Sequence, residues 1–360
     1  MVSRQPGEWN AALLGASTLK GKEVKAVLAE RSLPLRRLLL LDSEDVQGQL
    51  TDFDGEPAIV QPVGAETFEG IDLAIFAASE SFTQQHWRQA QENGCRIIDL
   101  SYFLESEPNA RLQAPLLMPP GETAESSDNG RMDSAAMAVS AHPMSIALQG
   151  ILALLSRRSV VVRAAATIFE PASEHGQAGV EELHRQTISL LAFQEIPKKI
   201  FDAQLSFNLL ARNGEQSRPT LQERQQRIAH HLRTLSGGRT VQPALRLLQA
   251  PLYHGYSFTC WVELAQPVEA EVLEAALDQK PFSVCREDQD QPSVISAAAS
   301  NDILLGSVEP DPAHEAAYWI WGAFDNLRIA ALNATRIAEE MMGVASGTIP
   351  AESGRPSVRL

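Results

Sequence analysis

The string LLGASTLKG near the start of the chain contains the first residues whose types and spacing could do chemistry. It begins as an apolar strand and turns through Gly15 and Gly21, which predicts a nucleotide pyrophosphate at the N-terminus of the next helix. Thr18 stands where a dinucleotide-binding turn has a third glycine, and its branched side chain predicts a strained backbone. Its hydroxyl, with Ser17 and Lys20, offers phosphate contacts that offset part of this cost. The sequence leaves two outcomes open, a weak nucleotide site or a site closed by Thr18.

Asp42 bears on which nucleotide such a site would hold. The strand RRLLLLD ends at Asp42, 21 residues after Gly21. A carboxylate here suits a ribose 2′-hydroxyl and repels a 2′-phosphate, so the sequence favours weakly held NAD over NADP. The alternative role of Asp42 is to end the strand in a polar loop.

The string AHPMSIALQG places His142 near Ser145 at the predicted start of a helix. A serine hydroxyl becomes a nucleophile only beside a base, and His142 is the candidate base. An acyl hydrolase built on this pair would lack the GxSxG turn of such enzymes. The ordinary structural role of Ser145 is that of a helix N-cap.

The elements that must position these residues fall into two patterns. Up to residue 140, short apolar runs alternate with helical stretches near 20–31 and 82–94, which predicts a parallel sheet covered on both faces. The predicted strands are WNAALLG, RRLLLLD, PAIVQPV, DLAIFAAS, CRIIDLS and AAMAVSA. The fold class is therefore an α/β Rossmann domain in residues 1–140, with a polar, Pro- and Gly-rich loop or linker at 118–133.

The second half of the chain has long β-rich runs mixed with helices. The runs VVVRAAATIF, ALRLLQAPLYHGYSFTCWVEL and ILLGSVEPD predict a large, mostly antiparallel sheet, and helices are expected near 178–191, 220–235 and 267–279. We expect an α+β domain over 141–323, a helix over 324–343 that packs back on the first domain, and a frayed tail over 344–360.

Composition limits the classes of partner. Among 360 residues, 30 Lys and Arg oppose 45 Asp and Glu, and a net charge of −15 disfavours nucleic acid and anionic membranes. No apolar run reaches the length of a membrane span, and the N-terminus lacks the apolar core of a signal peptide. The three scattered cysteines, Cys95, Cys260 and Cys285, fit a reducing cytoplasm, and we expect no metal site.

Four stretches resemble the aspartate-semialdehyde dehydrogenase family: LLGASTLKGKEVKAVLAERSLP, IIDLSYFLESEP, AHPMSIALQGILALL and FDNLRIAALNATRIAEE. The strings SFNLLAR and QAPLYHGYS are similar to its divergent USG-1-like branch. The resemblance implies a Rossmann domain that binds NAD or NADP, and an α+β domain that supplies catalysis and the homodimer interface. In the family reaction a cysteine thiolate attacks the aldehyde, a histidine acts as base, hydride passes to the nicotinamide, and phosphate releases aspartyl phosphate.

The residues of this chain depart from the family pattern at the reacting positions. Matching HP to the family NP puts Ser145 at the nucleophile, whereas counting back from the following strand puts Pro143 there. The family histidine becomes Tyr256, and His254, on the same face of a regular strand, is the candidate to replace it. Cys95 and the strand cysteine Cys260 are expected to be packed in the core.

The anion-binding positions also differ from those of the family. The resemblance places Glu105 at the phosphate-binding arginine, Gln249 at the arginine that holds the substrate carboxylate, and Glu170 near the substrate. A carboxylate at position 105 predicts repulsion of phosphate. For the cofactor, the resemblance adds the following residues to the glycine turn: Ala78, Ser79 and Asn326.

Two hypotheses follow. The first is a family member that keeps the fold and the dimer, has lost the family reaction, and serves as a binding or regulatory protein for which a small molecule is a candidate ligand. The second is a working NAD-dependent oxidoreductase on another small substrate, without a covalent thioester and with Tyr256 or His254 as acid or base. An open cleft with an ordered Tyr256 or His254 beside a cation would favour the enzyme, and a filled or acidic cleft would favour the binding protein.

Overall fold

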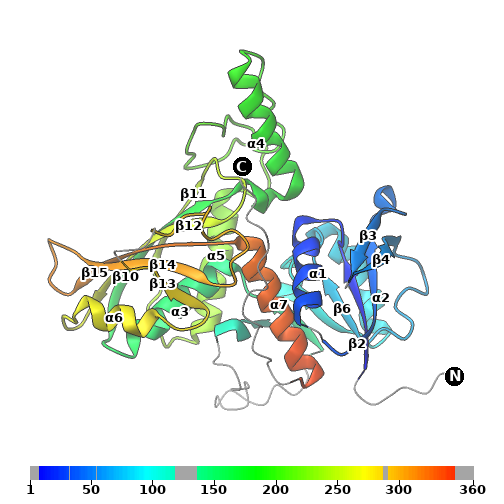
Figure 1. Ribbon diagram of the computed structural model, residues 1–360, viewed down its shortest axis with the longest axis horizontal. Helices are drawn as coiled ribbons and strands as arrows, with labels where there is room; N and C mark the ends of the chain where they lie inside the picture. Colours follow the sequence, from blue (N-terminus) through cyan, green and yellow to red (C-terminus); the bar gives the residue numbers. More distant parts are fainter. Residues whose placement is uncertain (1–7, 32, 54, 118–135, 287–290, 345–360) are drawn as a thin grey trace.

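The computed structural model describes residues 8–31, 33–53, 55–117, 136–286 and 291–344, and these form two domains side by side (Figure 1). The expected linker at 118–133 and nearly all of the expected tail at 344–360 lie outside the described residues. Helix α7 (Asn326–Met342) lies between the domains and packs against α1 (Leu19–Arg31) of the first.

The first domain is built on a seven-stranded sheet in which every neighbouring pair is parallel, as expected for a Rossmann domain. Its strands in spatial order are β5 (Gln61–Pro62), β2 (Leu35–Asp42), β1 (Trp9–Leu14), β6 (Leu73–Phe76), β7 (Arg96–Asp99), β9 (Met137–Ser140) and β8 (Ala110–Gln113). The predicted strand PAIVQPV is wrong in part: it divides into β5 and β4 (Glu56–Ile59), and β4 pairs with β3 (Leu50–Phe53) in a separate hairpin.

Both faces of the parallel sheet are covered because successive strand residues point to opposite sides. Ala11 and Leu13 of β1 belong to one buried cluster with residues of α1 and α7. Ala12 and Leu14 belong to a second cluster with Trp87 of helix α2, which spans Glu80–Glu92. This arrangement brings the carboxyl ends of β1 and β6, and the turns that follow them, to one edge of the sheet.

The second domain contains a six-stranded mixed sheet. Its strands in order are β11 (Ala244–Gln249), β10 (Val161–Glu170), β12 (Tyr256–Leu264), β15 (Ala317–Phe324), β14 (Ile303–Pro310) and β13 (Phe282–Val284), of which β10–β11 and β13–β14 are parallel pairs. The expected run 244–264 is two strands separated by a loop, and the interior strand β15 was not predicted from sequence.

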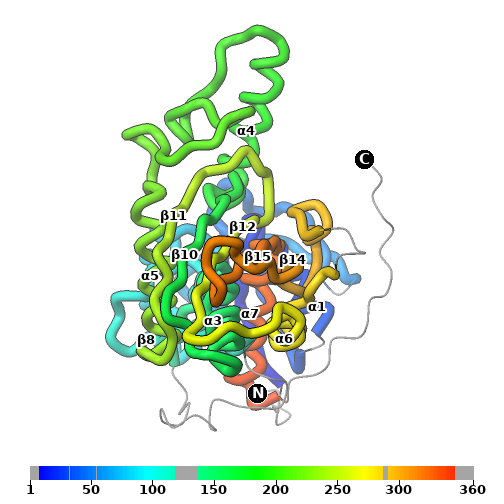
Figure 2. The backbone as a smooth tube through the Cα atoms, turned by 90° about the vertical axis from the view of Figure 1, so that its left-hand side faces the viewer, coloured from blue at the N-terminus to red at the C-terminus, as the bar shows by residue number. Residues whose placement is uncertain are grey.

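Helices cover one face of this mixed sheet. They are α3 (Pro143–Ser156), α5 (Leu221–Ser236) and α6 (Ala270–Leu277). Helix α4 (Gly176–Leu191) projects away from the sheet, as two perpendicular views show (Figures 1 and 2). The opposite face of the sheet is open to solvent, and Trp319 and Trp321 of β15 are 41% and 37% exposed there.

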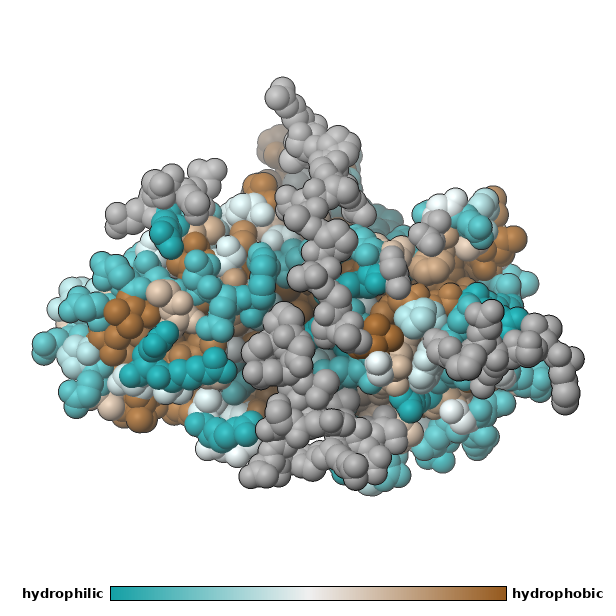
Figure 3. Space-filling model, turned by 60° about the horizontal axis from the view of Figure 1, so that its bottom comes forward, coloured by the Kyte–Doolittle hydropathy of each residue, from teal (hydrophilic) through white to brown (hydrophobic). Residues whose placement is uncertain are grey.

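In the part of the chain that the structure describes, no helix is both long and apolar enough to cross a membrane. The surface in Figure 3 carries hydrophilic side chains over both halves of the molecule, with smaller apolar patches between them.

Candidate active site

A cleft of about 1010 Å³ runs between the two domains. The first domain contributes the turn after β1, the turn after β6, and the 3-10 helix η2 (Phe103–Ser106). The second contributes the start of α3, the segment around η5 (Ala172–His175) and the first turns of α5. This is the position at which a doubly wound sheet binds its ligands.

The glycine turn has the tight geometry that its sequence predicted. Gly15 has a φ of 81°, and a Cβ there would lie 2.7 Å from the Cα of Ala78. A Cβ on Gly21 would lie 1.9 Å from the carbonyl oxygen of Gly15, so only glycine lets α1 pack this close to the turn. The N-terminus of α1 consequently opens onto the cleft through Thr18, Leu19 and Lys20.

The prediction of backbone strain at Thr18 is wrong, because Thr18 does not have a positive φ. Its hydroxyl lies 2.8 Å from the carbonyl oxygen of Gly15 and 2.9 Å from that of Ala77, and it accepts a hydrogen bond from the Gly21 N–H at 2.9 Å. Thr18 therefore closes the turn with its side chain, and this hydroxyl is occupied by the fold instead of being free for phosphate.

Asp42 ends β2, and its carboxylate is tied to backbone N–H groups. Oδ2 accepts a hydrogen bond from Ser17 at 2.8 Å and Oδ1 accepts one from Ser43 at 2.9 Å. The side chain is 8% exposed and lies outside the cleft lining, whereas Ala78 and Ser79 line the cleft. Ser79 is also the N-cap of α2, with Oγ accepting from the Phe82 N–H.

At the start of α3 the structure corrects the expected N-cap. The cap is His142, whose Nδ1 accepts a hydrogen bond from the Met144 N–H, and Pro143 is the first helical residue. Ser145 is fully buried, and its hydroxyl donates to the carbonyl oxygen of Ile228 at 3.1 Å. His142 lines the cleft and Ser145 does not, so the two do not form an accessible nucleophile and base.

The three cysteines do not supply a thiolate either. Burial raises the pKa of Cys95 to about 11 and that of Cys260 to about 12, and both are packed in the core as expected. Burial also raises the pKa of the half-buried Cys285. All three lie outside the cleft lining.

Tyr256 and Glu170 are brought together beneath the cleft. The Tyr256 hydroxyl is 3.4 Å from Glu170 Oε2, and both residues are fully buried. Glu170 Oε1 accepts from Arg224 Nη1 at 2.6 Å in a buried ion pair, and Arg224 in turn lines the cleft. Burial raises the pKa of Glu170 to about 7, against the opposing attraction of Arg224.

The other family-derived positions lie away from the open part of the cleft. His254 is exposed and precedes β12, so the expectation that it shares a strand face with Tyr256 is wrong. Gln249 is fully buried, and its Nε2 donates to the Glu170 carbonyl oxygen. Asn326 is buried and accepts from the Gly255 N–H, which ties α7 to the loop before β12.

Glu105 does not present an unpaired negative charge. Its Oε1 lies 3.1 Å from Arg227 Nε and 2.7 Å from His231 Nε2. Arg227 also bonds Glu80 at 2.8 Å and lies over the ring of Tyr102, which has a φ of 71°. The predicted repulsion of phosphate by Glu105 is therefore offset by the charge of Arg227 on α5.

Sequence reasoning missed the cationic face of α5, whose charges come from Arg224 and Arg227, because burial lowers the pKa of the neighbouring His231. Arg224, Arg227 and His231 follow one another at spacings of three and four residues, which places them on one face of a helix. That spacing is the signal that could have found them. Among charged residues of the cleft lining, Lys20, Arg218, Arg224 and Arg227 oppose Glu80, Glu174 and Glu223. No group of three or more His, Cys, Asp or Glu within the described ranges could hold a metal ion.

A parallel sheet with a glycine turn at its edge, a mixed-sheet domain and a cleft between them define a protein of the two-domain, nucleotide-dependent dehydrogenase class. Family models agree: the semialdehyde dehydrogenase NAD binding domain matches residues 10–191 and the semialdehyde dehydrogenase dimerisation domain matches residues 151–329. The chain belongs to the semialdehyde dehydrogenase family.

Individual relatives confirm the resemblance to aspartate-semialdehyde dehydrogenases and their USG-1-like branch. A USG-1 protein homolog of Pseudomonas aeruginosa is 30% identical over 338 residues, 92% of this chain and 96% of the relative. An aspartate-semialdehyde dehydrogenase of Rickettsia bellii is 26% identical, covering 93% of this chain and 98% of the relative. The structure of a probable aspartate-semialdehyde dehydrogenase from Pseudomonas aeruginosa superposes with a TM-score of 0.83 at 29% identity, covering 93% and 98% of the two chains.

Proposed function

We propose that this protein binds a nicotinamide nucleotide and a small anionic ligand in the interdomain cleft, and does not catalyse the thioester-dependent interconversion of aspartate semialdehyde and aspartyl phosphate. The observation that carries this proposal is the start of α3. The residue matched to the family nucleophile, Ser145, is buried and hydrogen-bonded to Ile228, and the alternative position, Pro143, has no nucleophilic side chain.

The protonation states of the cleft support the same proposal. Burial lowers the pKa of His142 well below its usual range, and its Nδ1 already accepts a backbone hydrogen bond, so it is a neutral imidazole engaged as a cap. Burial raises the pKa of Tyr102 well above its usual range, so this phenol stays protonated. Neither residue is a ready base at neutral pH.

The cleft is open and nearly balanced in charge, so it is neither filled nor acidic. Tyr256 and His254 do not line it, which removes support for an oxidoreductase that uses them as acid or base. The guanidinium groups of Arg224 and Arg227 do line it and remain protonated at neutral pH. They suit a small carboxylate or phosphate ligand.

The residues at the glycine turn fit a nicotinamide nucleotide, which would supply a hydride carrier when bound. At the N-terminus of α1 the backbone N–H groups of Leu19 and Lys20 are the candidates to bind a pyrophosphate, because those of Ser17, Thr18 and Gly21 are bonded within the turn, and Ala78 and Ser79 border the same space. Gly15 and Gly21 keep the turn tight enough for this approach. The site therefore fits a nicotinamide nucleotide, and residues 15–21 and 77–79 would hold it.

An activity assay tests the proposal. With aspartate semialdehyde, phosphate and either NAD or NADP, we expect no reduction of the nucleotide above background, because the cleft offers no thiolate for acyl transfer. Ser145→Cys should not restore activity, since the new thiol would be buried with a raised pKa. Turnover within tenfold of an active relative in the same assay would contradict the proposal.

Calorimetry tests the choice of nucleotide. We expect NAD to bind weakly and NADP more weakly still, because a carboxylate at the end of the second strand, here Asp42, suits a ribose 2′-hydroxyl and repels a 2′-phosphate in sites of this class. A Gly21→Ala variant shows whether the nucleotide binds at this turn. It should bind less nucleotide, because the added Cβ forces α1 away from the turn. Tighter binding of NADP than of NAD would refute the assignment.

A further inference from the structure

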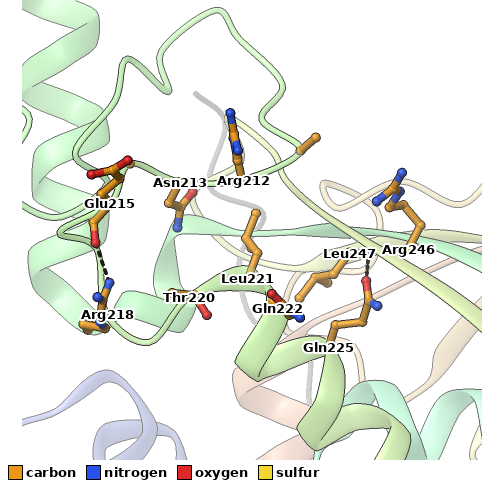
Figure 4. Close-up of a pocket in the computed structure, with 12 residues that line it drawn as sticks. Arg212, Asn213, Glu215, Arg218, Thr220, Leu221, Gln222, Gln225, Arg246 and Leu247 are labelled. Carbon is orange, nitrogen blue, oxygen red and sulfur yellow. Dashed lines mark hydrogen bonds between the residues drawn. The ribbon is translucent and has the colours of Figure 1, made fainter.

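A second cavity, of about 530 Å³, lies outside the interdomain cleft on the outer side of β11 (Figure 4). Its walls are the loop 211–218, the first two turns of α5, and the end of β11 around Arg246 and Leu247. We call it the arginine pocket because it contains Arg212, Arg218 and Arg246. Its volume is in the range of small-molecule sites.

The charge of this pocket is opposite to that of the whole protein. Three arginines and a single carboxylate, Glu215, line it, in a chain whose net charge is −15. The side chains of Arg212 and Arg246 make no hydrogen bond or ion pair with any of the described residues. In Figure 4 the Arg212 guanidinium lies above Leu221, and the Arg246 guanidinium lies to its right, above Gln225.

The remaining groups of the arginine pocket also favour an anion. The N-terminus of α5 enters it through Thr220, Leu221 and Gln222, and this end of a 16-residue helix carries partial positive charge, part of which the capping carboxylate of Glu223 offsets. On the same wall, the side-chain amide of Asn213 places its Nδ2 donor 3.4 Å from Ser217 Oγ, a long hydrogen bond. The N–H groups of this amide are donors from which an anionic oxygen accepts.

The arginine pocket is distinct from the cleft. Arg218 borders both cavities, with Nη1 donating to the carbonyl oxygens of Glu215 and Ser217, but Arg212 and Arg246 border only the pocket. A ligand there would not compete for Arg227, which faces the cleft.

We propose that the arginine pocket is a second ligand site, which binds a small molecule with two negative charges between Arg212 and Arg246. A dicarboxylate and a phosphate monoester share this chemistry. Two guanidinium groups that make no hydrogen bond or ion pair with the described residues give each acidic group its own charge-assisted hydrogen bonds. A monoanion satisfies only one of them.

Titration calorimetry on the full chain tests the proposal, with succinate and glycerol phosphate as dianion probes and acetate as the monoanion. We expect at least one dianion to bind in the arginine pocket, at least tenfold tighter than acetate. Arg212→Gln together with Arg246→Gln should weaken that binding at least tenfold. Arg239→Gln, which removes an exposed charge beyond the other end of α5, should leave it unchanged.

Arg227→Met separates the two sites, because it removes a cation of the cleft alone. Dianion binding that survives Arg227→Met and disappears in the double arginine variant supports the arginine pocket, whether or not the cleft binds a ligand. Equal binding of acetate and both dianions, no binding of any probe in Arg227→Met, or full binding in a folded double variant would overturn it. Circular dichroism of each variant reports its folding.

Discussion

At the scale of single residues, the pair Glu170–Arg224 decides the chemistry beneath the cleft. Both side chains are buried, and removing one partner leaves the other charge without compensation. Arg224→Met should lower the free energy of unfolding at pH 8.5 by about 3–5 kcal/mol, measured by urea denaturation. Glu170→Gln combined with Arg224→Met should recover most of this loss. If the double variant is as unstable as the single one, the ion pair is not the cause.

The pH dependence of the same pair follows from the raised pKa of Glu170. Folded Glu170 titrates at about 7, whereas an unfolded glutamate titrates at about 4.3, so the folded state binds the extra proton between these values. The contribution of Glu170 to stability therefore falls as the pH rises through this window. Without Arg224 the pKa of Glu170 rises further. Arg224→Met should therefore lower the free energy of unfolding more at pH 8.5 than at pH 5.5. An equal loss at both pH values would contradict the assignment.

At the scale of elements, α5 joins the two domains through its cationic face. Arg227 reaches Glu80 of α2 and Glu105 of η2, and these ion pairs are partly exposed. Arg227→Met should weaken succinate binding in the cleft at least tenfold by calorimetry, but change the free energy of unfolding by only about 1 kcal/mol, because exposed pairs add little stability. The control is Arg233→Met, at an exposed position in the last turn of α5. Equal effects of the two variants would exclude a specific role for Arg227.

At the scale of the whole molecule, we propose a homodimer formed through the open face of the mixed sheet. Trp319 and Trp321 lie on this face, with the partly buried Trp261 of β12 beside them, and a monomer would leave this apolar surface in water. Light scattering at micromolar concentration should give about twice the chain mass of 39.2 kDa. Trp319→Lys should shift the mass toward the monomer, and Val272→Lys on α6 should not. A monomer in the unmodified protein would refute the dimer.

The sequence alone predicted the features that depend on local pattern. Apolar runs separated by helices predicted the parallel sheet, and Gly15 and Gly21 predicted a turn that no side chain could fill. The lack of a cysteine at the start of α3 was visible in the same way. Strand β15 was not predicted, although it forms a local hairpin with β14; its interior place in the sheet depends on its pairing with β12, which joins distant parts of the chain.

Only the tertiary structure decided what the substituted polar residues do. Glu170 and Arg224 are 54 positions apart, and Glu105 and His231 are 126 apart, so no local pattern reveals that each acidic replacement has a basic partner on α5. Likewise, only packing shows that Ser145 is sealed against Ile228 while His142 caps the helix. The sequence by itself determined which side chains are present at the family positions. The fold determined their exposure and charge, because burial and ion pairing depend on neighbours that the chain brings together only when it folds.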